Sequence, residues 1–125
     1  MTLSCGPQTA DRINLLQGNS TIIRLKLCAD GIPVPNLSSA IGGSFQLLGH
    51  RDNVVGIFKN WGSLLINNPV TGIISVPLTS PETDALDGEY DISVEVVWGP
   101  GNRLEWNFPR TLNVIRDQIL FEDQP

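Results

Sequence analysis

The fold is decided by one stretch of the sequence, Tyr90-Asp91-Ile92-Ser93-Val94-Glu95-Val96-Val97-Trp98. Apolar residues occupy every second position, and most residues between them are polar. Because side chains on a strand point alternately to its two faces, this period predicts a strand with one buried and one wet face. After the turn Gly99-Pro100-Gly101-Asn102 the alternation resumes over residues 103–108. A short glycine-containing loop between two such runs predicts a β-hairpin.

The same period, followed outward from this hairpin, predicts further strands. They cover residues 12–16, 20–28, 44–48, 54–59, 64–66 and 72–79, the 64–66 segment being the weakest. Pro109 interrupts the second strand of the hairpin, and Leu112 and Val114 recover its pattern. Proline cannot donate to a strand ladder, so we expect a bulge or a switch between sheets near Pro109.

One segment reads as helical. Ser80 is expected to cap a short helix that begins at Pro81 and stops at Asp87-Gly88, which gives a helical turn near residues 80–87. Seven or eight short strands with frequent turns predict an all-β fold, an antiparallel β-sandwich of the immunoglobulin-like kind. We expect the sandwich to span residues 11–117, between an N-terminal arm (residues 1–10) and a C-terminal arm (residues 118–125).

Composition limits the function. The chain has 125 residues and a net charge of −5, which fits one domain. No Lys or Arg occurs between Trp61 and Asn102, and the eight basic residues are scattered. Nucleic-acid binding needs a basic patch, and a membrane span needs about 20 apolar residues, so we expect neither partner. The first ten residues lack the charge and the apolar run of a secretory signal.

Two cysteines, Cys5 and Cys28, are too few for a disulfide framework and lack metal-ligand spacing. We favour free thiols in a reducing cytoplasm over a disulfide between them.

Little in the sequence points to catalysis. The single histidine, His50, lies in a predicted turn beside Asp52, where a solvated loop residue is the favoured interpretation. No nucleophile elbow, phosphate-binding loop or metalloprotease helix occurs. Carboxylates crowd residues 82–95 and could hold calcium, but without the regular loop spacing we favour the wet face of a strand. We therefore expect no enzyme, no cofactor and no metal.

The three tryptophans suggest another possibility, a sugar-stacking platform. Trp98 and Trp106 lie on the apolar phases of paired strands, so we expect them in the core. Trp61 lies in the loop Asn60-Trp61-Gly62, where an exposed ring would serve as an interface anchor. The sequence leaves the exposure of Trp61 open.

Three segments together resemble a small Ig-like module of tailed-phage tail and baseplate proteins, such as baseplate upper proteins and fibre-anchoring domains. The opening strand and its turn correspond to residues 11–20. The middle corresponds to Gly72 to Thr79, then Thr83 to Gly88, then Tyr90-Asp91-Ile92, and the closing strand to residues 112–117. Each motif alone is common in sandwiches, and their order and spacing carry the resemblance.

The resemblance implies a virion component, assembled in the host cytoplasm, whose partners are other phage structural proteins of the tail, baseplate or fibre. We expect no fibre domain after residue 117, which favours an adaptor or connector. Virion rings are symmetric, so we also expect repeated copies. The candidate interface residues are Trp61 and the apolar arm residues Ile119, Leu120 and Phe121. The alternative function is a carbohydrate-binding module that uses exposed loop aromatics.

Overall fold

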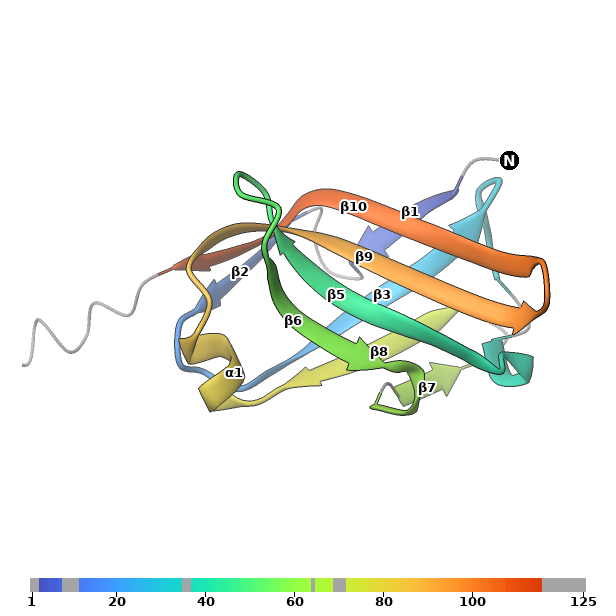
Figure 1. Cartoon of the computed structure of the whole chain (residues 1–125), viewed down its shortest axis with the longest axis horizontal. Helices are drawn as coiled ribbons and strands as arrows, with labels where there is room; N and C mark the ends of the chain where they lie inside the picture. Colours follow the sequence, from blue (N-terminus) through green and yellow to red (C-terminus); the bar gives the residue numbers. More distant parts are fainter. Residues whose placement is uncertain (1–2, 8–11, 35–36, 64, 69–71, 116–125) are drawn as a thin grey trace, which may run out of the picture.

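Two β-sheets face each other in the computed structural model, which describes residues 3–7, 12–34, 37–63, 65–68 and 72–115 (Figure 1). The strands are β1 (Leu3–Pro7), β2 (Ile13–Leu16), β3 (Thr21–Ala29), β4 (Ile32–Pro33), β5 (Gly42–Gly49), β6 (Val55–Asn60), β7 (Leu65–Asn68), β8 (Ile73–Leu78), β9 (Gly88–Gly99) and β10 (Asn102–Ile115). The short helical elements are η1 (Leu37–Ser39), η2 (Trp61–Ser63) and α1 (Ser80–Asp84).

The strand order is that of an immunoglobulin-like sandwich. One sheet runs β1-β3-β8-β7, with β4 paired to β3, and the other runs β2-β10-β9-β5-β6. The second sheet has further strands on both sides of the β9–β10 hairpin, and variable-type immunoglobulin domains have such an enlarged sheet. The predicted fold class is thus confirmed, with two strands (β1 and β4) beyond those expected from alternation. One pair departs from the antiparallel rule, because β2 lies parallel to the end of β10.

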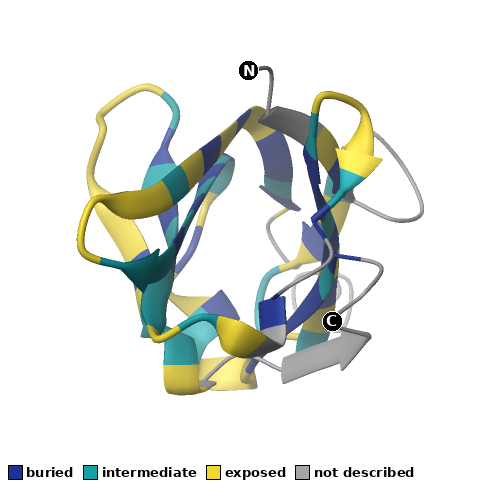
Figure 2. Ribbon diagram, turned by 90° about the vertical axis from the view of Figure 1, so that its right-hand side faces the viewer, coloured by how far each residue is buried: buried dark blue, intermediate teal, exposed yellow. Residues whose placement is uncertain are grey.

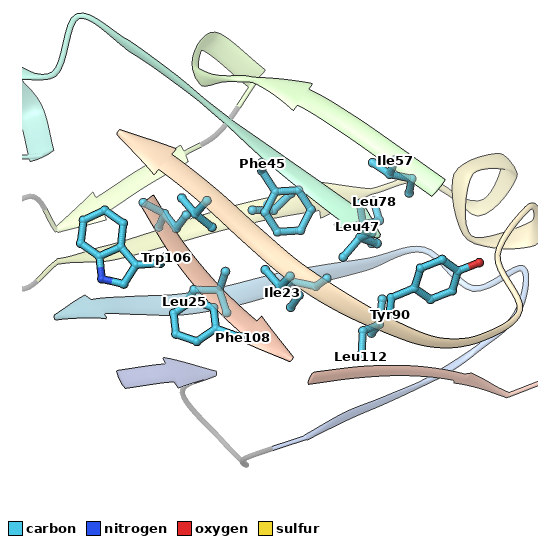
Figure 3. Close-up of a cluster of buried hydrophobic side chains, with 14 of the residues drawn as sticks. Ile23, Leu25, Phe45, Leu47, Ile57, Leu78, Tyr90, Trp106, Phe108 and Leu112 are labelled. Carbon is cyan, nitrogen blue, oxygen red and sulfur yellow. The ribbon is translucent and has the colours of Figure 1, made fainter. Parts of the chain in front are cut away.

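The core lies between the two sheets and follows the predicted alternation. Figure 2 shows buried positions on strands on both sides of the sandwich. Along β9, Tyr90, Ile92, Val94 and Val96 are buried, whereas the residues between them are partly exposed. Figure 3 shows side chains of both sheets meeting in this layer; the labelled ones are Ile23, Leu25, Phe45, Leu47, Ile57, Leu78, Tyr90, Trp106, Phe108 and Leu112. This apolar layer is the main source of stability in the fold.

The interruption at Pro109 is a bulge, the first of the two alternatives that the sequence left open. Phe108 pairs with Ile92, and the next pair is Leu112 with Tyr90, so three residues of β10 lie opposite Asp91 alone. Arg110 adopts a φ of 54° there, and its backbone N–H donates to the Asp91 carboxylate at 2.8 Å. The Asp91 side chain thus accepts a hydrogen bond from a backbone N–H that the bulge removes from the strand ladder.

Helix α1 begins one residue earlier than the sequence suggested. Thr79, not Ser80, is the N-cap, since its hydroxyl accepts from the Glu82 N–H and its own N–H donates to the Glu82 carboxylate at 2.8 Å. This reciprocal pair is a capping box, which requires Ser or Thr three positions before Glu or Gln. Ser80 has no such partner at position 83, and that spacing explains the correction.

Two polar side-chain groups of the β9–β10 hairpin, the Tyr90 hydroxyl and the Trp106 indole N–H, form hydrogen bonds to the backbone outside the hairpin. The Tyr90 hydroxyl accepts from the Asp87 N–H at 3.0 Å, the arrangement called a tyrosine corner in immunoglobulin-like domains. The Trp106 indole donates to the carbonyl oxygen of Cys28 at 2.8 Å and is fully buried. Trp106 is therefore a core residue, as its phase predicted.

The expectation of free thiols is wrong, because Cys5 and Cys28 form a disulfide. The bond joins neighbouring strands of one sheet, since Cys5 of β1 lies opposite Leu27 of β3. Antibody domains instead place their disulfide between the two sheets. A spacing of 23 residues does not reveal that the chain returns to the same edge, which is why sequence reasoning missed this bond.

The N-terminal arm also needs correction. Residues 3–7 of the ten assigned to it form β1 and pair with β3 from Leu3↔Ala29 to Pro7↔Leu25. Gly6 is buried, and a methyl group there would lie 3.7 Å from the Phe108 ring. β1 has no period-two pattern, and its Gly-Pro pair resembles a turn, so the alternation test could not find it.

Candidate functional site

Trp61, the predicted interface anchor, begins η2 and is partly buried against the edge of the core. A methyl group at Gly43 of β5 would lie 3.1 Å from Cε3 of Trp61 and would collide with the carbonyl oxygen of Glu95. Gly43, whose φ is 152°, therefore lets the indole approach the β5 backbone closely. One side of the ring is used for packing within the domain, which leaves less of it for a partner than a free loop tryptophan would offer.

The other three predicted interface residues, Ile119, Leu120 and Phe121, lie outside the described residues. The last described strand, β10, ends at Ile115, whose side chain is 41% exposed.

Four of the six carboxylates in residues 82–95 contact a lysine, arginine or histidine side chain. Glu82 accepts from Lys59, Glu89 from Arg12 at 2.6 Å, Asp91 contacts His50, and Glu95 accepts from Arg103 at 2.9 Å. Within the described part of the chain, no group of three or more His, Cys, Asp or Glu side chains could hold a metal ion. These ion pairs join strands and turns of the domain, so they supply a structural explanation for the acidic stretch.

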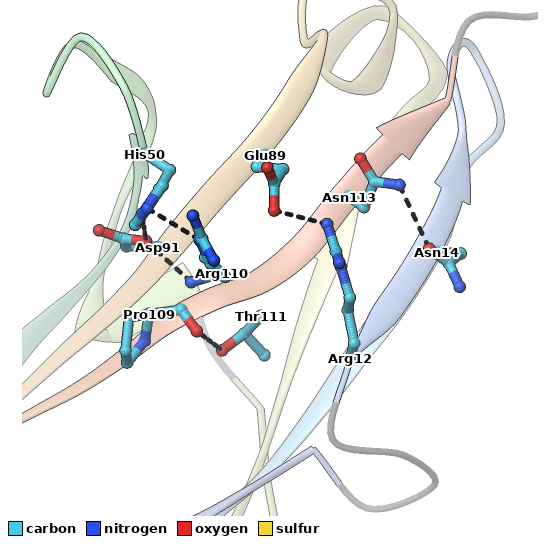
Figure 4. A network of polar contacts seen from close by, with 9 residues as sticks. All are labelled: Arg12, Asn14, His50, Glu89, Asp91, Pro109, Arg110, Thr111 and Asn113. Atoms are coloured by element: carbon cyan, nitrogen blue, oxygen red, sulfur yellow. Dashed lines mark hydrogen bonds and ion pairs between the residues drawn. The ribbon is translucent and has the colours of Figure 1, made fainter.

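His50 belongs to a polar network at the bulge of β10 (Figure 4). Its Nδ1 lies 2.8 Å from Asp91 Oδ1, and its Nε2 lies 3.0 Å from Arg110 Nε. The guanidinium is always a donor, so Nε2 must accept and Nδ1 must carry the proton. The network thus ties the β5–β6 turn to the bulge through one imidazole. The sequence pointed to Asp52 as the neighbour of His50, whereas the register of β5 against β9 places Asp91 there.

The chemistry available to this network can be compared with an Asp-His-nucleophile triad. In a triad the imidazole Nε2 faces a hydroxyl or thiol whose proton it accepts. Here Nε2 faces Arg110, a permanent cation with no proton to give at neutral pH. The geometry therefore fits a clamp on the β10 bulge better than a general base.

The most conspicuous surface feature is the outer edge of β6, which ends the five-stranded sheet. Val54, Val55 and Phe58 are 60%, 49% and 57% exposed. Among the described residues β6 pairs with β5 alone, so one row of its backbone N–H and C=O groups faces away from the sheet. We name this surface, residues 54–60, the β6 edge. Native proteins usually protect such edges with charges or proline, because an open apolar edge invites pairing with another chain.

The β6 edge holds little charge. Lys59 is its one ionisable residue, and its Nζ donates to both carboxylate oxygens of Glu82 at 3.1 and 2.9 Å. Hydrogen bonds from the Thr79 N–H and from Lys59 lower the pKa of Glu82, which favours its ionised form beside Lys59. Lys59 is thereby directed to α1, and its charge is compensated within the domain.

Sequence reasoning predicted the strand but missed its exposed apolar face. The available signal was the run Val54-Val55-Gly56-Ile57-Phe58, which places apolar residues on both phases of a single strand. Ile57 lies on the face of the strand that is buried in the core. Phe58 lies on the opposite face, which no layer of the described residues covers.

A second surface feature lies at the end of the sandwich that carries the β9–β10 hairpin. A hollow of about 340 Å³ is lined by Ala29, Ile32, Pro33, Val34, Trp98, Asn102 and Leu104. Trp98 is partly buried there, so the sequence was right about its contact with the core and did not show that it also borders a hollow.

Together these observations describe an immunoglobulin-like domain whose β6 strand presents exposed apolar side chains at a sheet edge. Neither a protein-family model nor the sequence of a curated protein matches the chain. Among solved structures, murine CRIg is similar at 11% identity and a TM-score of 0.47, over 94% of this chain and 99% of that one. A chain from a structure on T cell specificity and activation by the bacterial superantigen toxic shock syndrome toxin-1 is similar at 13% identity and a TM-score of 0.45, over 91% and 98%. At these values the likeness is one of fold class alone.

Within the described residues, no helix is long and apolar enough to cross a bilayer.

Proposed function

We propose that the chain is a non-enzymatic structural protein of a tailed-phage virion, an Ig-like adaptor that joins components of the tail, baseplate or fibre. One observation carries the proposal: the β6 edge presents three exposed apolar side chains beside unpaired backbone groups. Strand addition to an open edge is a general mode of protein joining, in which backbone hydrogen bonds supply affinity and side chains supply specificity.

Two further features support a joining role. The one histidine is held by an aspartate and an arginine in a clamp, which favours a scaffold over a catalytic centre. The Cys5–Cys28 disulfide suits a particle that leaves the reducing host cytoplasm, because disulfides persist on virion and cell surfaces. The apolar residues Ile119, Leu120 and Phe121 are proposed as part of a second docking segment.

The proposal is tested on particles. We expect the chain to be recovered in gradient-purified virions of the phage that encodes it, at a fixed ratio to the major tail protein in mass spectrometry. A chain that remains with the soluble cell fraction, with none in the particles, would contradict the virion role. A variant that lacks residues 118–125 should fold normally, since β10 ends at Ile115, and should enter particles less efficiently. Normal incorporation of that variant would remove the docking segment from the proposal.

A second candidate function, carbohydrate binding, now rests on a different tryptophan. Trp98 borders the hollow at the hairpin end together with Asn102, a combination of aromatic face and amide that can bind a sugar ring. A glycan array distinguishes the two functions. Sugar binding that is lost in Trp98→Ala and kept in Trp61→Ala would favour this candidate over the adaptor.

A further inference from the structure

The β6 edge differs from the other three sheet edges of the described chain. The edge strands are β1, β7, β2 and β6, with five, four, four and six residues. β1 contains Pro7 and is bonded covalently to β3 through Cys5. A bulge at Gly56 lies near the turn end of β6, since Leu48 pairs with Val55 and Leu47 with Ile57. Beyond it, residues 57–60 pair regularly and leave their outer side open.

We propose that the β6 edge binds the β6 edge of a second copy of this chain, antiparallel and across a two-fold axis. The two five-stranded sheets then form one continuous sheet, in which the Phe58 side chains of the two copies pack together on its outer face. This inference deepens the proposed function and rests on its use of the β6 edge for joining. An antiparallel strand pair is compatible with a two-fold axis, and two-fold dimers are the commonest homo-oligomers.

Charge favours a second copy as the occupant. The chain carries a net charge of −5, so two copies repel each other over most of their surfaces. Residues 54–60 contain no Asp or Glu, and the charge of Lys59 is compensated by Glu82. The β6 edge is therefore a surface through which an acidic protein can meet itself without bringing uncompensated like charges together.

The partly exposed face of the sheet beside β6 is compatible with this pairing. Phe58 lies opposite Gln46 of β5, which lies opposite Ser93 of β9. These neighbours are short or neutral side chains, so a second Phe58 can approach without displacing a charge. A six-residue strand is a small interface, and we expect a weak dimer at the low end of specific association.

The test is sedimentation equilibrium of the isolated, oxidised protein between roughly 1 µM and 1 mM. We expect the mean mass to rise from one copy to two. Phe58→Glu should weaken dimerisation by at least about ten-fold, because a central aromatic anchor becomes a charge. Ile22→Glu is the matched control, since Ile22 is 45% exposed on β3 of the other sheet, and it should leave the dimer unchanged. Circular dichroism and thermal melting check that both variants fold.

A single added thiol gives an independent reading. The two native cysteines are bonded to each other, so Phe58→Cys adds the one free thiol of the chain. Under mild oxidation we expect it to form covalent dimers at least about ten times faster than Ile22→Cys, because paired strands hold directly opposite side chains close together. A monomer throughout the concentration range, a dimer indifferent to Phe58→Glu, or equal cross-linking rates would each overturn the inference.

The two proposals fail separately. A monomeric protein that is still recovered in virions would remove the dimer and keep the adaptor. A dimer of a protein absent from virions would do the reverse.

Discussion

The Tyr90 hydroxyl oxygen holds the segment that leads from α1 into β9. The Tyr90 ring is buried at the start of β9, and 9% of the residue is exposed. Asp87 lies in the segment between α1 and β9, and its backbone N–H donates to this hydroxyl at 3.0 Å. A phenol at the end of a rigid ring thus supplies the acceptor for this N–H.

We expect Tyr90→Phe to fold and to lose about 1–2 kcal/mol of unfolding free energy, since the Asp87 N–H loses its acceptor. Urea denaturation followed by tryptophan fluorescence measures the difference. The m-value should stay constant, because the surface exposed on unfolding does not change. Equal stability of Tyr90→Phe and the native chain would show that solvent satisfies this N–H.

His50 gives a prediction that needs no stability measurement. Because Arg110 donates to Nε2, the neutral imidazole should be the Nδ1–H tautomer, with its proton directed at Asp91. The chain has one histidine, so long-range ¹⁵N correlation spectra at neutral pH report on His50 alone. Arg110→Ala should move the spectrum toward a mixture of tautomers, and Arg51→Ala, a neighbouring exposed position, should not. A predominant Nε2–H form in the native chain would exclude the network.

At the scale of elements, the capping box of α1 also anchors the open edge of the sheet. Glu82 binds the Thr79 N–H at one end and Lys59 of β6 at the other. The sequence predicted a helix here from Ser80-Pro81 but placed the cap one residue late. The spacing Thr79-x-x-Glu82 was the stronger signal, because it satisfies two donors at once.

Glu82 makes stability depend on pH in a definite direction. Its pKa is lowered in the folded state, first by the Thr79 N–H and then by Lys59, so the unfolded chain binds the proton more tightly. The stabilisation is therefore present above the ordinary carboxyl pKa and is lost as the pH falls through the lowered value. We expect Glu82→Gln to cost about 0.5–1 kcal/mol at neutral pH, and progressively less as the pH falls below the ordinary carboxyl pKa. Urea denaturation at several pH values measures this.

The control is Glu105→Gln, an exposed position on β10, whose effect should be small at every pH. A cost of Glu82→Gln that does not shrink as the pH is lowered would show that the carboxylate charge is not responsible.

The disulfide adds a covalent link to the pairing of β1 with β3. It closes a loop with a sequence separation of 23, and by chain entropy such a loop stabilises the folded state by about 3 kcal/mol. We expect reduction to lower the unfolding free energy of the native chain by about this amount. The double variant Cys5→Ala/Cys28→Ala should have the same unfolding free energy as the reduced protein, and added reductant should not change it. A native chain with two titratable thiols after purification in air would contradict the bond.

For the whole molecule, the sequence predicted the layers better than their edges. Alternation located β9, β10, β3 and β8 because each has one face in the core, and Pro109 predicted a bulge or a switch between sheets, of which the structure has the bulge. It could not find β1, β4 or the parallel pairing of β2 with β10, since these depend on which segments meet in space.

The candidate site was the harder part for the same reason. Trp61 was chosen as an anchor because it lies in a loop, yet Gly43 allows the ring to pack against β5. The sequence predicted that Phe58 lies in a strand but not on which face of it. When apolar residues occupy both faces of a strand, the sequence does not reveal which face the second sheet covers. The whole structure was needed to show that the edge was open.

The bond between Cys5 and Cys28 also decides how the domain would carry mechanical tension. A force applied to the chain before Cys5 passes through the sulfur atoms directly to Cys28 in β3. The parallel ladder between β2 and β10 therefore carries none of this force. Cleaving that bond reroutes the force along β2, where a parallel ladder pulled from opposite ends is sheared rather than unzipped. In optical tweezers, the oxidised domain should therefore release about 80 Å less chain than the reduced one.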